Sequence, residues 1–375
     1  MLYVRFQRLP IIAFVAGSVL SALFIFAPAT IASTGSVAED IADVDGIVYA
    51  SVQMGDRTII GGQFTTAGGL PRQNVAAIEA DGTVDPTWNP SVDGIVYAVA
   101  PSDDGTKIFL GGGFTTVDGV AHGRIAAVDS VTGALISSWK TQAKNNLVRA
   151  LATSSGRLYV GGSFSRIGGK AVNRLASLDQ ATGVVNTSFA PHPDATVRAV
   201  DVSPDGQKLY AGGPFKNIAL VARPGAAELN AADGTATGFA PTDGGVVIAI
   251  DTMPDGSRVF FSSTNNRTWA YDPAVSNTPA YRVRTGGDVQ AIAATSDEVY
   301  IGGHFLTLPE AKVDRLKLAS FDPSNGAVTD WNPGANGPFG VWTITAAPDF
   351  LAIGGDFTRV GGVRHQGFAR FPGTP

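Results

Sequence analysis

The chain has 375 residues, 16% of them charged, and a formal net charge of −5 at pH 7. It holds 46 glycines and 22 prolines, as in folds with many tight turns, and no cysteine, which excludes disulfide bonds, thiolate metal sites and cysteine nucleophiles. A nucleic-acid partner is not expected, because an acidic chain lacks the basic face that a phosphate backbone requires.

The first 32 residues have the pattern of a secretory signal peptide. Arg5 and Arg8 precede an apolar run from Ile11 to Phe26, and small residues follow it up to Ala32. An uncleaved N-terminal anchor is the alternative, because the run is close to the shortest length that spans a bilayer. We expect a protein that is secreted or held on the extracellular face of the cell surface. It would have a single domain over residues 33–375 and no membrane span in the mature chain.

A short motif recurs along the rest of the chain: two glycines, a variable residue and a phenylalanine. It stands at 61–64, 111–114, 161–164, 212–215, 302–305 and 354–357, and a worn copy fits at 261–264. Measured from positions 61, 111, 161, 212, 262, 302 and 354, successive copies lie 50, 50, 51, 50, 40 and 52 residues apart. Seven units at this period predict one repeat domain.

The unit between Ile95 and Lys140 shows the expected order of strands. Strands are predicted at 95–100, 107–114 and 124–129, with a fourth ending at Trp139 and turns at 102–105 and 129–133. The second strand is apolar without alternation, as are its counterparts, which indicates a sheet covered on both faces. Such sheets pack against one another in a β-propeller. We predict an all-β, seven-bladed propeller of four-stranded antiparallel blades, with the paired glycines allowing backbones to approach closely.

Two further features of the repeat have competing explanations. Carboxylates recur in turns such as Asp129-x-x-Thr132-Gly133 and could serve calcium binding or catalysis, but their fixed spacing to glycine favours turn formation. The predicted fourth strands end in an aromatic residue, for example at Trp88, Phe189, Phe239 and Trp331. These rings could stack on sugars, but the free exchange of phenylalanine for tryptophan favours packing.

The two ends of the domain are predicted to complete one blade together. The last unit stops after its third strand, at Pro372, whereas the segment from about Val37 to Val44 stands where a fourth strand would precede the first inner strand. Pairing of this N-terminal strand with the last blade would close the ring and remove open sheet edges.

The combined motif is Gly-Gly-x-Phe-Thr-x-x-Gly-Gly, then Arg-x-x-Ala-x-x-Asp-x-x-Thr-Gly, then Trp-Asn-Pro. It resembles the delta-60 repeat β-propeller family of secreted bacterial proteins of unknown function, and more loosely the fungal cortical-marker surface proteins. The match covers nearly everything from Gly46 to Pro372. The resemblance implies seven blades and an extracellular location, and it brings no catalytic residues. The fifth unit lacks both glycines and is about ten residues short, so an irregular blade is expected there.

The third position of each inner strand differs from one unit to the next. It holds Tyr49, Tyr97, Arg149, Arg198, Ile248, Gln290 and Trp342. Packing tends to repeat a residue in every unit, whereas a ligand site has reason to vary it. We therefore predict a site at one mouth of the axial channel for an anionic or sugar-like group. Its residues are Tyr49, Tyr97, Arg149, Arg198, Gln290 and Trp342; the alternative is that these side chains pack between blades or face solvent.

The mature sequence lacks the usual catalytic motifs, such as Gly-x-Ser-x-Gly, His-Glu-x-x-His and the phosphate-binding loop. The four histidines lie in different units, so no metal site and no cofactor are expected. We predict a monomeric, non-catalytic binding module for a carbohydrate or a cell-surface protein. The alternatives are an extracellular polysaccharide hydrolase or lyase, a quinoprotein-like dehydrogenase, and a purely structural surface protein.

Overall fold

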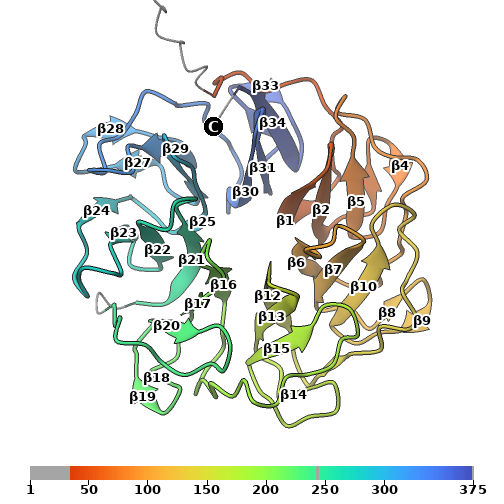
Figure 1. Ribbon diagram of the computed structural model, residues 1–375. Helices are drawn as coiled ribbons and strands as arrows, with labels where there is room; N and C mark the ends of the chain where they lie inside the picture. The colour runs from red at the N-terminus through yellow and green to blue at the C-terminus, as the bar shows by residue number, and fades with distance from the viewer. Residues whose placement is uncertain (1–33, 242–244, 374–375) are drawn as a thin grey trace, which may run out of the picture. The chain divides into compact units, whose positions relative to one another are not determined.

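The strands of the protein are short, and tight turns return the chain beside the strand it has just left. The computed structural model describes residues 34–241 and 245–373 (Figure 1). The regular elements in these ranges are all β-strands. None of the described residues forms a helix long and apolar enough to cross a membrane. The predicted signal peptide, residues 1–32, lies outside the described residues.

Seven antiparallel sheets of three or four strands form within the described residues. The first three contain β1 (Ile47–Met54), β2 (Arg57–Gln63) and β5 (Val75–Ile78); β6 (Val96–Pro101), β7 (Lys107–Gly112) and β10 (Ile125–Asp129); and β12 (Val148–Ser154), β13 (Arg157–Gly162) and β15 (Leu175–Asp179). The fourth and fifth contain β16 (Ala199–Val202), β17 (Lys208–Gly212) and β20 (Ala226–Asn230); and β21 (Val247–Thr252), β22 (Val259–Ser263), β23 (Arg267–Tyr271) and β24 (Tyr281–Arg284). The sixth and seventh contain β25 (Val289–Ala294), β26 (Val299–Gly303) and β29 (Leu318–Phe321); and β30 (Val341–Ala347), β31 (Phe350–Gly355) and β34 (Phe368–Pro372).

Short two-stranded pairs occupy the glycine-bearing loops that follow the middle strands. They are β3 (Thr66–Ala67) with β4 (Leu70–Pro71), β8 (Thr116–Val117) with β9 (Val120–Ala121), β18 (Asn217–Ile218) with β19 (Val221–Ala222), β27 (Thr307–Leu308) with β28 (Val313–Asp314), and β32 (Arg359–Val360) with β33 (Val363–Arg364). In the third unit β14 (Arg166–Ile167) pairs instead with β11 (Ala143–Lys144). The sequence predicted no strands in these segments.

The first strand of each sheet contacts the first strands of the adjacent sheets. β1 contacts β6, and the series continues through β12, β16, β21 and β25 to β30, which in turn contacts β1 (Figure 1). The middle strands are buried along nearly their whole length; in β7 only Lys107 is partly exposed. Burial on both faces is what the absence of alternation predicted.

The paired glycines allow two close contacts at once. A Cβ added to Gly111 would lie 2.6 Å from a methyl carbon of Val148, in the next sheet, so this glycine sets how closely neighbouring sheets pack. A Cβ on Gly112 would lie 2.0 Å from the carbonyl oxygen of Ile95, beside the first strand of its own sheet. Neither position has room for a side chain. Matching pairs of contacts recur at residues 61–62, 161–162, 212–213, 302–303 and 354–355.

The prediction of four-stranded blades is wrong for six of the seven sheets. In the second sheet the expected fourth strand makes a single bridge, from Val128 to Leu135. The Trp139 N–H then donates to the carbonyl oxygen of Ile136 (2.9 Å), and this turn directs the chain away from the sheet. Trp139 is fully buried in a cluster with residues of the third sheet. The strand ends early because its aromatic residue must reach the neighbouring sheet.

The fifth sheet was expected to be irregular, yet it is the one with four paired strands. β24 pairs with β23 over four residues, from Ala270↔Tyr281 to Arg267↔Arg284. The aromatic residue that contacts the next sheet, Tyr281, lies inside β24, and its hydroxyl donates to the carbonyl oxygen of Pro323 (2.6 Å). The strand can therefore continue to its full length.

The segment before β1 lies along β34 but does not form the predicted N-terminal strand. The N–H groups of Gly35 and Glu39 donate to the carbonyl oxygens of Pro372 (2.7 Å) and Arg370 (2.8 Å). No residue from 34 to 43 is assigned to a strand. Regular pairing is interrupted because Pro372 has no N–H to return a hydrogen bond.

Turn formation and packing explain the recurring carboxylates and aromatic rings, as predicted. The Asp129 carboxylate accepts hydrogen bonds from the N–H of Thr132 (2.7 Å) and from its hydroxyl (2.9 Å), and Gly133 has a φ of +74°. Trp88 is fully buried, and a Cβ on Gly133 would lie 3.3 Å from its ring. The ring therefore packs against the turn of the next unit.

The close contacts of the paired glycines predict a specific loss of stability. Gly112→Ala should lower the free energy of unfolding by on the order of 3 kcal/mol, because the added methyl group meets backbone atoms that cannot move independently. Gly238→Ala is the matched control, since a Cβ there has nothing within 4 Å, and its effect should stay within about 0.5 kcal/mol. Urea unfolding measures both; equal effects would contradict this role for the glycine.

Candidate functional site

The first strand is irregular at the same place in six of the seven sheets. In β1 the pairing with β2 shifts between Val48 and Ala50, which leaves Tyr49 as the extra residue of a β-bulge. Bulges redirect a side chain away from the regular pleat. The same shift occurs at Tyr97, Arg149, Ile248, Gln290 and Trp342. In the fourth sheet Arg198 stands just before β16, and its N–H donates to the carbonyl oxygen of Gly212 (2.7 Å).

These redirected side chains meet in one cavity of about 460 Å³, within the usual size range of small-molecule sites. Its lining residues are Tyr49, Tyr97, Arg149, Arg198, Ile248, Thr264, Asp288, Gln290 and Trp342. The structure thus brings together all six residues that the sequence predicted as a site. It adds Thr264 and Asp288, which sequence reasoning missed. Thr264 holds the variable place of the worn Gly-Gly-x-Phe copy, and Asp288 immediately precedes β25.

An aromatic wall forms one part of the cavity. The ring centroid of Tyr49 lies 5.2 Å from that of Tyr97 and 5.3 Å from that of Trp342, with tilted and edge-on geometry. Burial, and to a smaller extent the neighbouring Tyr97, raises the pKa of Tyr49, so its hydroxyl stays protonated at neutral pH. The indole N–H of Trp342 is buried and has no hydrogen-bond partner in the described part of the chain. The wall therefore offers a ligand mainly the apolar faces of its rings.

Two arginines form the adjacent part of the wall. The Arg149 guanidinium lies over the Tyr97 ring, 5.0 Å from its centroid. Burial, and then the nearby Arg149 charge, lowers the pKa of Arg198. Neither side chain forms an ion pair or hydrogen bond with any residue that the structure describes. Two like charges without an anion between them are suited to bind an anionic group.

A carboxylate and an amide lie on the remaining side. Asp288 has no ion-pair or side-chain hydrogen-bond partner among the described residues. None of the six predicted site residues carries a carboxylate, so Asp288 brings a negative charge to the cavity that the inner-strand positions do not supply. The Gln290 amide group faces the carbonyl oxygens of Phe339 and Val341; the amide orientation that satisfies it places the nitrogen 2.9 Å and 3.3 Å from them, as a donor to both.

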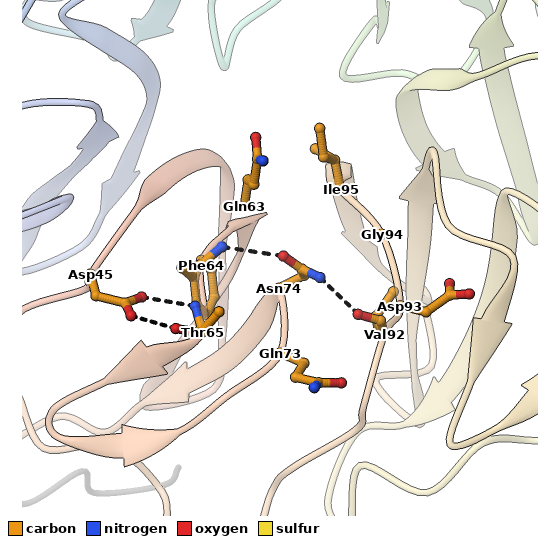
Figure 2. A pocket seen from close by; sticks show the side chains of 10 residues that line it. All are labelled: Asp45, Gln63, Phe64, Thr65, Gln73, Asn74, Val92, Asp93, Gly94 and Ile95. Carbon is orange, nitrogen blue, oxygen red and sulfur yellow. Dashed lines mark hydrogen bonds between the residues drawn. The ribbon is translucent and has the colours of Figure 1, made fainter.

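A larger cavity, of about 620 Å³, lies between the first and second sheets (Figure 2). Several of its polar groups are already bonded within the protein. The Asp45 carboxylate accepts hydrogen bonds from the N–H (2.8 Å) and the hydroxyl (2.6 Å) of Thr65. Asn74 accepts from the Phe64 N–H (3.2 Å) and donates to the carbonyl oxygen of Val92 (2.7 Å). The cavity that contains the unpaired charges is therefore the better candidate for a ligand site.

Comparisons with known proteins agree with this fold. A model of the family described as "Domain of unknown function (DUF5122) beta-propeller" matches residues 56–87 and 153–189. The search of curated proteins found no match. The chain is similar to one in the crystal structure of the mitotic checkpoint complex, with 14% identity, a TM-score of 0.66 and 100% of both chains covered. It is also similar to the WD40 β-propeller domain of Doa1, with 13% identity, a TM-score of 0.63, and 91% of this chain and 97% of that chain covered.

The fold and the family match define the class: this is an all-β protein with a β-propeller fold, similar to a propeller repeat family of unknown function. Structural similarity at identities this low concerns the fold alone and says nothing about the ligand.

The unpaired state of Arg198 predicts that it contributes little to stability. Arg198→Gln should change the free energy of unfolding by no more than about 0.5 kcal/mol. The substitution breaks no ion pair or side-chain hydrogen bond, and it removes the repulsion between Arg198 and Arg149. Arg258→Gln should lower it by about 2 kcal/mol, because Arg258 pairs with Asp272 (2.7 Å) and donates to the carbonyl oxygen of Ser324 (3.0 Å). Chemical denaturation distinguishes the two, and a large loss for Arg198→Gln would mean that this side chain supports the fold.

Proposed function

We propose that the protein is a secreted or cell-surface binding module without catalytic activity, whose bulge-lined cavity holds the anionic group of a sugar-like ligand. The observation that carries the proposal is the pair Arg149 and Arg198, two guanidinium groups that line one cavity and form no ion pair or side-chain hydrogen bond within the described chain. A carboxylate or sulfate between them would receive charge-assisted hydrogen bonds.

The aromatic wall supports the sugar-like part of the ligand. Tyr49 and Trp342 line the cavity with apolar ring faces. Faces of this kind stack on the C–H faces of sugar rings while their polar ends form hydrogen bonds. The ligand would be a carbohydrate, free or displayed on a cell-surface partner.

Polysaccharide cleavage is the alternative, and Asp288 is the observation that favours it. Glycoside hydrolysis ordinarily uses two carboxyl groups on opposite sides of the scissile bond. Among the described residues that line the cavity, Asp288 is the only carboxylate, and none is a histidine. We therefore favour binding without cleavage.

We also propose that the seven sheets are the blades of a closed ring, with the N-terminal segment completing the last blade. Contacts between β30 and β1, and the hydrogen bonds of Gly35 and Glu39 to β34, support this arrangement. The side chain of Glu39 forms an ion pair with Arg370, which is 9% exposed and also donates to the carbonyl oxygen of Ala80 (2.8 Å). A ring that closes on itself would make residues 33–375 a single domain, and we propose that it is a monomer.

Binding of the anionic group can be tested with D-glucuronic acid and D-glucose as probes in isothermal titration calorimetry at pH 7. The acid should bind at least about tenfold more tightly than glucose, and Arg149→Gln combined with Arg198→Gln should remove that preference.

The matched control for this experiment is Arg282→Gln combined with Arg284→Gln, which removes the same charge from exposed positions of β24. It should change the affinity for the acid by less than about twofold, because the distant charges are screened by salt. Equal binding of the two sugars, or equal losses in both double variants, would contradict the proposed function.

Closure by the N-terminal segment predicts an effect of Glu39→Gln. The change leaves the largely buried guanidinium of Arg370 without its charge partner and should lower the free energy of unfolding by about 1–3 kcal/mol. Asp56→Asn, at an exposed turn, is the control and should have almost no effect. If Glu39→Gln is as stable as the parent protein, the segment does not hold the last sheet.

A further inference from the structure

The charges of the cavity are segregated around its wall. Arg149 and Arg198 come from the third and fourth sheets, whereas Asp288 comes from the sixth. Ile248, from the fifth sheet, also lines the cavity. No ion pair joins Asp288 to either arginine. The protein thus keeps opposite charges in one cavity without letting them neutralise each other.

The acidic side of the cavity is also its aromatic side. β25, which follows Asp288, contacts β30, and β30 contacts β1, so the strands that carry Trp342 and Tyr49 come next. The Tyr97 ring is already occupied by the guanidinium of Arg149. Tyr49 and Trp342 remain available, and aromatic faces beside a carboxylate attract a cationic group.

A second carboxylate nearby is not available for a ligand. Asp356 accepts hydrogen bonds from the N–H groups of Phe339 (2.9 Å) and Gly340 (2.5 Å). These bonds hold its oxygens in the loop before β30. Asp288, which forms no such bond, is the carboxylate that remains free to bind a ligand.

We propose that the cavity recognises a dipolar ligand: a sugar-sized molecule that carries both a carboxylate and an ammonium group. Arg149 and Arg198 bind the carboxylate, and Asp288, with the faces of Tyr49 and Trp342, binds the ammonium group. A ligand with both charges pairs every charged side chain of the wall, whereas a simple anion leaves Asp288 desolvated and unpaired. This inference rests on the proposed function and narrows it to amino sugar acids with a free amine.

Four probes test the inference by calorimetry at pH 7. Muramic acid carries both charges, N-acetylmuramic acid only the carboxylate, D-glucosamine only the ammonium group, and D-glucose neither. We expect muramic acid to bind at least about tenfold more tightly than either singly charged probe, because each pairs only one side of the wall.

Asp288→Asn should remove the advantage of muramic acid over N-acetylmuramic acid and leave the affinity for the latter within about twofold. Asp297→Asn, at the exposed turn between β25 and β26, should keep the full advantage and serves as the control for lost negative charge. The unfolding midpoint of each variant confirms that it is folded, and Asn at 288 keeps the size of the side chain.

The outcomes separate this inference from the function on which it rests. Equal affinities for muramic and N-acetylmuramic acid, or an advantage that survives Asp288→Asn, overturn the dipolar ligand and leave anion binding intact. Binding of glucosamine as tightly as muramic acid also overturns it, because the carboxylate would then contribute nothing. If neither acid binds better than glucose, both the inference and the proposed function fail.

Discussion

The structure depends on the contact that a missing Cβ allows at the paired glycines. The first glycine of each pair lets the next sheet approach, as Gly111 does with Val148, and the second lets the first strand of its own sheet bend inward, as Gly112 does with Ile95. Any side chain would force one of these surfaces away. Because Gly354 would meet Val48 in the same way, this contact also joins the last sheet to the first.

At the same contact, the first strand has one position that packs in the core and a next position that is free to vary. Opposite five of the six glycine pairs the first strand has one extra residue, and the bulge turns its side chain into the cavity rather than between sheets. Valine before the bulge packs against the neighbouring sheet in every unit, while the bulge residue ranges from isoleucine to arginine. A side chain at the cavity-facing position does not pack between sheets. This position can therefore hold Arg198 without an ion-pair partner and without loss of core packing.

Much of this was predictable from the sequence, and the failures have definite causes. Fixed spacing revealed the repeat, and unalternated middle strands such as Lys107–Gly112 predicted burial on both faces. Aligning the repeats also identified the residues that meet in the cavity. The early end of the fourth strands was missed because it depends on where a ring such as Trp139 must pack, which is a contact between units. Asp288 was missed because it precedes its strand, at a position where the other units hold uncharged residues such as Ile95, Thr196 and Gly340.

The fifth sheet shows that the bulge does not require glycine itself. Ser262 and Ser263 stand where the glycines would be, and the pairing still shifts between Val247 and Ala249. Both serines are fully buried, and the Ser262 hydroxyl shares a hydrogen bond with that of Thr268 (2.6 Å), so its polar atom is satisfied within the sheet. A buried hydroxyl needs such a partner, and β23, which follows β22 directly, supplies it. The serines can therefore replace the glycines because the short connection between β22 and β23 brings a hydrogen-bond partner beside them. The bulge is kept, and Ile248 stays in the cavity wall between the arginines and the acidic side.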